Sequence, residues 1–118
     1  HAVTQFTWRY EALNVLLWAL GLLDDLPMPN AICDVALMAR TIDRCAELGA
    51  AARLRAPGEL LDTLDLHYRL HWRSRQCELD GQPMPADLDP GVILERHFAL
   101  NWLVHFEDAD WDEVDTPT

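Results

Sequence analysis

Lysine is absent from this chain of 118 residues, and all nine of its basic residues are arginine. The absence excludes chemistry that needs a lysine amine, such as a Schiff base or a lysine-type phosphate loop. Acidic residues number 20, so the formal net charge is −11. Because this charge repels nucleic-acid phosphates, we expect no nucleic-acid partner, whereas a basic protein partner would suit it.

Cysteine is also scarce. Cys33, Cys45 and Cys77 show no C-x-x-C spacing and are too few for a disulfide scaffold. They predict free thiols in a reducing compartment, and hence a cytoplasmic protein. No apolar run approaches the roughly 20 residues of a membrane span, so no membrane partner is expected. Glycine-rich nucleotide motifs are missing as well, and we expect no cofactor.

Apolar residues recur at helical spacing in four stretches, and no stretch shows convincing strand alternation. The chain therefore predicts a single all-α domain over residues 1–118, a compact antiparallel bundle of about four main helices. The predicted helices begin at Thr4 or Thr7, at Asn30, at Pro57 and at Pro90 after an Asp89 cap. They end near 21, 49 and 79, and the last one leads into an acidic tail that we expect to pack back on the bundle.

The first and last helices each place an arginine on a leucine face. Arg9 shares its face with Leu13, Leu16 and Leu20, and Arg96 shares its face with Ala99, Leu100 and Leu103. A buried guanidinium needs a carboxylate partner, and the alternative is an arginine at the core edge that reaches water. Glu11 and Asn14 lie opposite the leucine face of the first helix, which is apolar over much of its circumference and fits a central helix packed on more than one side. In the last helix, His97, Asn101 and His105 form a polar stripe that could contribute an acid–base group but that we expect to be a solvated face.

The acidic tail is the richest supply of carboxylates, and Trp111 gives it an apolar anchor. We hypothesise that Asp112 or Asp115 reaches Arg9 or Arg96, with Trp111 packed beside the pair. The competing interpretation is a frayed acidic terminus. These five residues are our structural or binding candidates.

The best metal candidate is His67-x-x-x-His71 with Glu78 seven residues further on. This spacing puts two imidazoles and a carboxylate on one helical side, a set that can hold zinc or a non-haem metal. Tyr68 stands where a H-E-x-x-H protease has its glutamate. Because leucines share the stripe, we expect the histidines to sit at the core edge without a structural metal.

Four segments of the chain resemble the bacterial DUF4272 family, a domain of unknown function. They are WRYEALNVLLWALG (8–21), LDLHYRLHW (64–72), ERHFALNWL (95–103) and WDEVDT (111–116). Family members are usually longer at the N-terminus, so the chain looks like the C-terminal part of the family domain. The resemblance implies no catalytic residue or ligand, but places Arg9, Arg96, Trp111 and Asp112 in the family pattern.

Three functional hypotheses follow. The favoured one is an uncharacterised protein-binding or interaction domain for a basic partner, a class that includes small acidic immunity proteins. The second is a metal-dependent enzyme that uses His67 and His71. The third is a structural module completed by a region N-terminal to this chain. An enzyme is the less favoured outcome, and a cysteine hydrolase is not expected because no third residue orients Cys77 and His71.

Overall fold

A computed structural model describes residues 2–118, and the side chains of all of these except residues 2–7 and 45. Over this range the chain forms helices and loops without a β-strand, as the all-α prediction requires. The helices are α1 (Ala2–Ala19), α2 (Val35–Asp43), α3 (Cys45–Leu48), α4 (Pro57–Asp80) and α5 (Pro90–Leu103). Short 3-10 helices lie between α3 and α4 (η1, Gly49–Ala51), between α4 and α5 (η2, Pro85–Asp87) and after α5 (η3, Phe106–Asp108, and η4, Trp111–Glu113).

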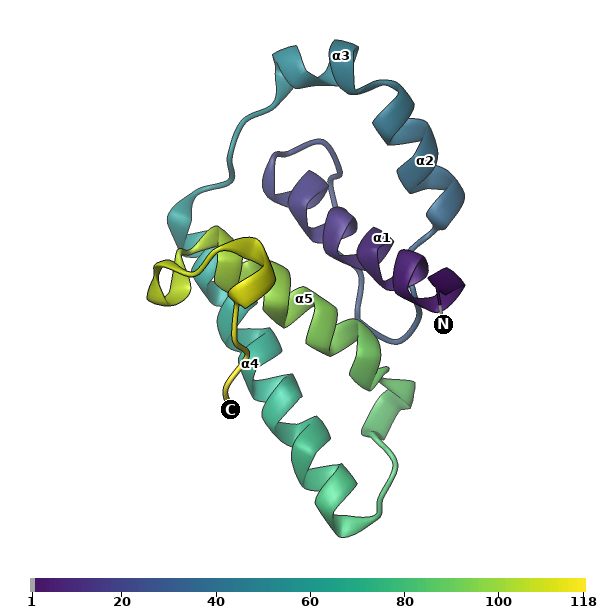
Figure 1. Cartoon of the computed structure of the whole chain (residues 1–118), viewed down its shortest axis with the longest axis vertical. Coiled ribbons are helices and arrows are strands. Elements are labelled where there is room, and N and C mark those ends of the chain that lie inside the picture. Colours follow the sequence, from purple (N-terminus) through teal and green to yellow (C-terminus); the bar gives the residue numbers. More distant parts are fainter. Residues whose placement is uncertain (1) are drawn as a thin grey trace.

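Helix α5 occupies the middle of the fold and packs against both α1 and α4 (Figure 1). It runs antiparallel to α4 and in the same general direction as α1. The predicted antiparallel arrangement therefore holds for the α4–α5 pair but not for the α1–α5 pair. The core formed between the helices contains Ala12, Val15, Trp18, Ala19, Leu60, Ala99 and Leu100. None of the described helices combines the length and the apolar character that a bilayer crossing demands.

Local chemistry accounts for the ends of α4 and α5. Pro57 stands in the first turn of α4, where its missing N–H costs nothing, and Gly81 ends the helix with a φ of 65°. Asp89 caps α5, because its Oδ1 accepts the N–H of Gly91 at 2.8 Å and that of Val92 at 3.3 Å. These boundaries agree with the sequence predictions.

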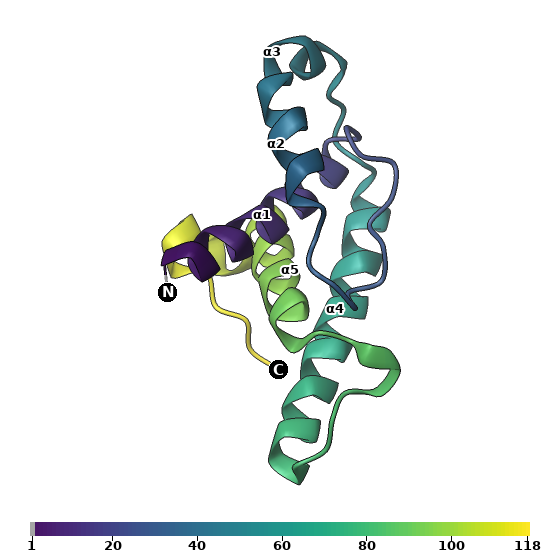
Figure 2. The ribbon, with the colours of Figure 1, turned by 90° about the vertical axis from the view of Figure 1, so that its right-hand side faces the viewer.

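The predicted helix from Asn30 to Gly49 is wrong at its start and is interrupted. Asp34, not Asn30, is the cap of α2, and its Oδ1 accepts the N–H of Leu37 at 3.0 Å. The preceding residue, Cys33, donates its N–H to a carboxylate on α1, which keeps this segment out of the helix. Figure 2 shows α2 and α3 at one end of the molecule. Of the other long helices, α2 packs on α1, and its Val35 is exposed.

The polar stripe of the last helix is buried at His97 and Asn101 rather than solvated, which corrects the sequence prediction, whereas His105 is exposed as expected. Glu11, Asn14, His97 and Asn101 are all buried, whereas Arg9, expected on a core face, is exposed. The physical reason is the central position of both helices. Because α5 has α1 on one side, α4 on another and the C-terminal tail on a third, most of its circumference is covered, and Leu94 and Trp102 remain exposed.

Candidate functional site

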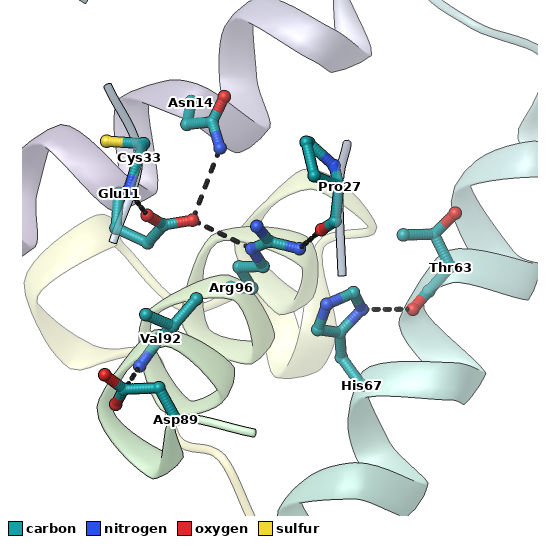
Figure 3. Close-up of polar contacts among 9 residues, drawn as sticks. All are labelled: Glu11, Asn14, Pro27, Cys33, Thr63, His67, Asp89, Val92 and Arg96. Atoms are coloured by element: carbon teal, nitrogen blue, oxygen red, sulfur yellow. Dashed lines mark hydrogen bonds and ion pairs between the residues drawn. The ribbon is translucent and has the colours of Figure 1, made fainter. Parts of the chain in front are cut away.

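A buried ion pair joins the two central helices. Nε of Arg96 donates to Oε1 of Glu11 at 2.8 Å, and the two side chains are 2% and 0% exposed. Figure 3 shows the guanidinium of Arg96 between this carboxylate and Pro27, whose carbonyl oxygen accepts from Nη1 at 2.6 Å. The guanidinium thus has a charged partner on one side and a backbone acceptor on the other.

The carboxylate of Glu11 collects donors from three parts of the chain. Besides Arg96, it accepts the side-chain amide of Asn14 at 3.3 Å and the backbone N–H of Cys33 at 2.8 Å. The hydrogen bond from the N–H of Cys33 holds the segment between α1 and α2 against the core. Burial, together with the nearby charge of Glu11, raises the pKa of the Cys33 thiol to about 12. We therefore expect Cys33 to be a poor nucleophile in the folded protein.

Arg96 has the carboxylate partner that its predicted burial demanded, but the partner is Glu11 and not Asp112 or Asp115 of the tail. Glu11 lies on the face of the first helix opposite its leucines, and the sequence analysis did not propose it as a partner. Asp115 is exposed, and its backbone oxygen accepts from the Asn101 side chain at 2.9 Å. The tail is therefore held to α5 through its backbone at this point, while Oδ1 of Asp115 accepts the N–H of Thr116 at 2.8 Å.

The predicted metal set does not come together. His67 and His71 are buried, but Glu78 is exposed. Nδ1 of His71 lies 2.8 Å from Nδ1 of His97 on α5, and Nδ1 of His67 lies 2.8 Å from the carbonyl of Thr63. Within the described part of the chain, no three His, Cys, Asp or Glu side chains are grouped so that they could hold a metal ion.

The three buried histidines favour the neutral form. Burial lowers the pKa of His67 and that of His97 to about 4, with further lowering of His67 by the charge of Arg96 and of His97 by the neighbouring histidines. Burial also lowers the pKa of His71, helped by the charge of Arg75. These imidazoles therefore act as hydrogen-bonding groups of the core near neutral pH.

A pocket of about 750 Å³ lies where the C-terminal tail meets α1 and α5, and we call it the tail pocket. The tail reaches this place because Trp111 stacks edge-on against Phe98 and Trp102, with ring centroids 4.8 and 5.2 Å away. The packed-back tail of the sequence prediction is thus confirmed. Lining residues of the tail pocket are Trp8, Arg9, Ala12, Leu94, Glu95, Phe98, Trp111, Asp112 and Thr116.

Three of the five predicted site residues, Arg9, Trp111 and Asp112, therefore meet in the tail pocket. The sequence analysis missed Glu95 and Trp8, although both belong to segments that carried the family resemblance. Glu95 is partly buried, and this burial raises its pKa above the ordinary value, with a smaller contribution from Glu11. A carboxylate in this position gains from any cation that enters the pocket.

Comparison with known proteins agrees with the resemblance of the sequence. The model of the family described as "Domain of unknown function (DUF4272)" matches residues 1–114. No curated protein and no solved structure matches the chain.

Proposed function

The chain belongs to the DUF4272 family, a domain of unknown function, and we propose that it is a protein-binding domain for a basic partner. In this proposal the tail pocket takes an arginine or lysine side chain of that partner. The observation that carries it is the presence of three aromatic rings and two carboxylates in one pocket of an acidic protein.

Aromatic rings and carboxylates attract a cation in complementary ways. The rings of Trp8, Phe98 and Trp111 supply π systems, each of which attracts a nearby cation by about 0.5–2 kcal/mol. Glu95 and Asp112 supply full charges, and a bidentate pair with an incoming guanidinium would fix its orientation. The pocket thus offers both parts of a site for a cationic side chain.

The balance of charge favours a cation over an anion. Arg9 also lines the pocket, so its ionisable groups comprise two carboxylates and one guanidinium. The formal net charge of −11 extends this field over the molecule. Long-range attraction of this kind accelerates encounters with a basic partner at low ionic strength and weakens when salt is added.

Peptide binding tests the proposal. The probes are short peptides that contain arginine or lysine, compared with acidic peptides of the same length, and binding is followed by calorimetry and by tryptophan fluorescence. We expect the basic peptides alone to bind, with an affinity that falls as salt rises. Equal binding of acidic and basic peptides would reject a cation site.

Matched variants locate the binding. Asp112→Asn removes a charge from the pocket, whereas Glu113→Gln removes one from the next residue of η4, which does not line it. We expect Asp112→Asn and Glu95→Gln each to weaken binding about fivefold, and Glu113→Gln to change it less than twofold. Equal losses in all three variants would mean that net charge, and not the pocket, is responsible.

An immunity protein that neutralises a basic toxin is one member of this functional class. A gene for a small basic toxin beside the gene for this chain would single it out, and a metabolic operon would point elsewhere. For the second hypothesis, a metal-dependent enzyme on His67 and His71, the test is stoichiometric zinc that survives dialysis and is lost in His71→Ala.

A further inference from the structure

His67 carries a buried nitrogen without a partner. Among the described side chains, its Nε2 is the buried nitrogen or oxygen atom for which no hydrogen bond exists. The residue is only 2% exposed, and it comes from the middle of α4. A polar atom that has lost water without gaining another partner is rare in folded proteins and asks for an explanation.

The chemistry of this atom follows from the other ring nitrogen. Nδ1 of His67 lies 2.8 Å from the backbone oxygen of Thr63. A carbonyl oxygen only accepts, so Nδ1 must carry the hydrogen. The ring is neutral near pH 7, because burial and the charge of Arg96 lower its pKa to about 4. Nε2 therefore presents a lone pair, and only a donor can satisfy it.

A cavity lies beside this lone pair. It has a volume of about 210 Å³, and its lining includes Trp18, Asp24, Asp25, Pro27, His67 and Arg96. Figure 3 shows the second nitrogen of His67 turned away from Thr63, toward the side on which Pro27 and Arg96 lie. The unpartnered atom thus points toward Pro27 and Arg96, which line the same cavity as His67.

The polar groups that line the cavity favour a ligand that donates hydrogen bonds. Nε and Nη1 of Arg96 are already bonded to Glu11 and to the carbonyl of Pro27, so the charge of this guanidinium is matched. The other polar side chains of the lining are those of Trp18 and Thr63, the Nε2 acceptor of His67, and the carboxylates of Asp24 and Asp25, which are both exposed toward solvent. Acceptors and negative charge together disfavour anions and favour groups rich in N–H.

We propose that this cavity is a second binding site, for a small organic cation of the guanidinium or ammonium class. One N–H of the ligand donates to Nε2 of His67, and its charge faces Asp24 and Asp25 at the mouth. The site lies beside α4 and the segment after α1, and it shares no lining residue with the tail pocket. It is therefore independent of the proposed function.

The test uses methylguanidine as the probe and the nitrogen resonances of the histidine rings in ¹⁵N-labelled protein as the readout. We expect the Nε2 signal of His67 to shift on addition of methylguanidine, as a lone pair does when it accepts a hydrogen bond. Tetramethylammonium, a cation without N–H, should leave it unchanged, and so should acetate. The exposed His105 serves as an internal control for general changes of solvent.

Variants supply a second readout. His67→Phe keeps a ring and removes the acceptor, and we expect it to weaken methylguanidine binding about tenfold. Asp24→Asn should weaken binding about threefold, whereas Asp43→Asn, the same change at an exposed residue outside the cavity, should not alter it. Glu95→Gln in the tail pocket should also leave this binding intact.

Three outcomes would overturn the inference. One is an Nε2 signal of His67 that does not respond to the probe in the parent protein, which would mean that solvent alone satisfies this atom. Another is an equal response to tetramethylammonium. The third is binding that survives His67→Phe unchanged. The first two measurements need no variant, so they decide the matter even if His67→Phe fails to fold.

Discussion

Replacing Arg96 with methionine should destabilise the domain by about 3–5 kcal/mol, because it leaves the carboxylate of Glu11 buried without a cation. The magnitude follows from burial, since the two side chains are only 2% and 0% exposed and their atoms are 2.8 Å apart. The N–H of Cys33 and the amide of Asn14 would still donate to Glu11, but neither carries a charge. The carbonyl of Pro27 would lose its donor as well.

Arg69→Met is a matched control. Nε of Arg69 lies 3.0 Å from a carboxylate oxygen of Asp65, but these side chains are 76% and 61% exposed. Solvent screens such a pair, so we expect a loss of about 0.5 kcal/mol or less. The two variants therefore remove the same chemical group from ion pairs that differ in burial.

A double variant separates the lost attraction from the stranded charge. In Glu11→Leu/Arg96→Met both charges are gone, and apolar side chains of similar volume fill the space. Much of the lost stability should return, as happens when buried ion pairs are replaced as a unit. The assay is urea unfolding followed by far-UV circular dichroism, with the slope compared between variants to check that unfolding stays two-state.

The result that would refute this reasoning is Arg96→Met within about 1 kcal/mol of the parent protein, the range of an exposed pair. If the double variant is no more stable than Arg96→Met, the unpaired carboxylate of Glu11 is not the cause of the lost stability. Packing of the long Arg96 side chain would then account for it.

The free energy of unfolding should rise by about a few kcal/mol as the pH increases from about 4 to the ordinary histidine pKa of 6.5, because the pKa values of two histidines are lowered. The sign follows because the pKa values of His67 and His97 are lowered in the folded state, so the unfolded chain binds more protons between these pH values. Thermal melts across this pH range measure the effect, and a melting temperature that does not change with pH would contradict it. Cys33, with its pKa raised to about 12, should react slowly with a thiol reagent at pH 8 in the folded protein and fast after denaturation. A fast native reaction would contradict its placement beside Glu11. Asn101→Ala should cost about 1 kcal/mol and speed proteolysis of the tail, because it removes the donor to the backbone oxygen of Asp115. Unchanged proteolysis would show that Trp111 alone holds the tail.

The helical class and the ends of α4 and α5 could be predicted from the sequence because they depend on neighbours along the chain. A proline in the first turn, an aspartate cap and a glycine at the C-terminal end each act on backbone groups within about four residues of themselves. The packing of the acidic tail on the bundle could also be predicted from the sequence. Trp111 is a large apolar side chain that is costly to leave in water, so its return to the bundle could be expected from the tail sequence.

The prediction failed where it had to decide which face of a helix is buried. Helical spacing relates residues on one helix to one another, but does not say how many sides of that helix are covered. For α5 the answer came from α1, α4 and the tail together, so His97 and Asn101 are buried although their stripe is polar. The start of α2 shifted for a related reason, since a carboxylate on α1 captures the N–H of Cys33.

The sequence by itself determined that Arg96 would need an anion if it were buried, because an unpaired guanidinium in the core is too costly. Only the tertiary structure decided that the anion is Glu11, 85 residues away, since that pairing requires α1 and α5 to lie side by side. The tail pocket divides in the same way. Helical spacing pointed to Arg9, and the acidic tail with its apolar anchor pointed to Trp111 and Asp112, but Glu95 joins them only because the tail folds back over α5.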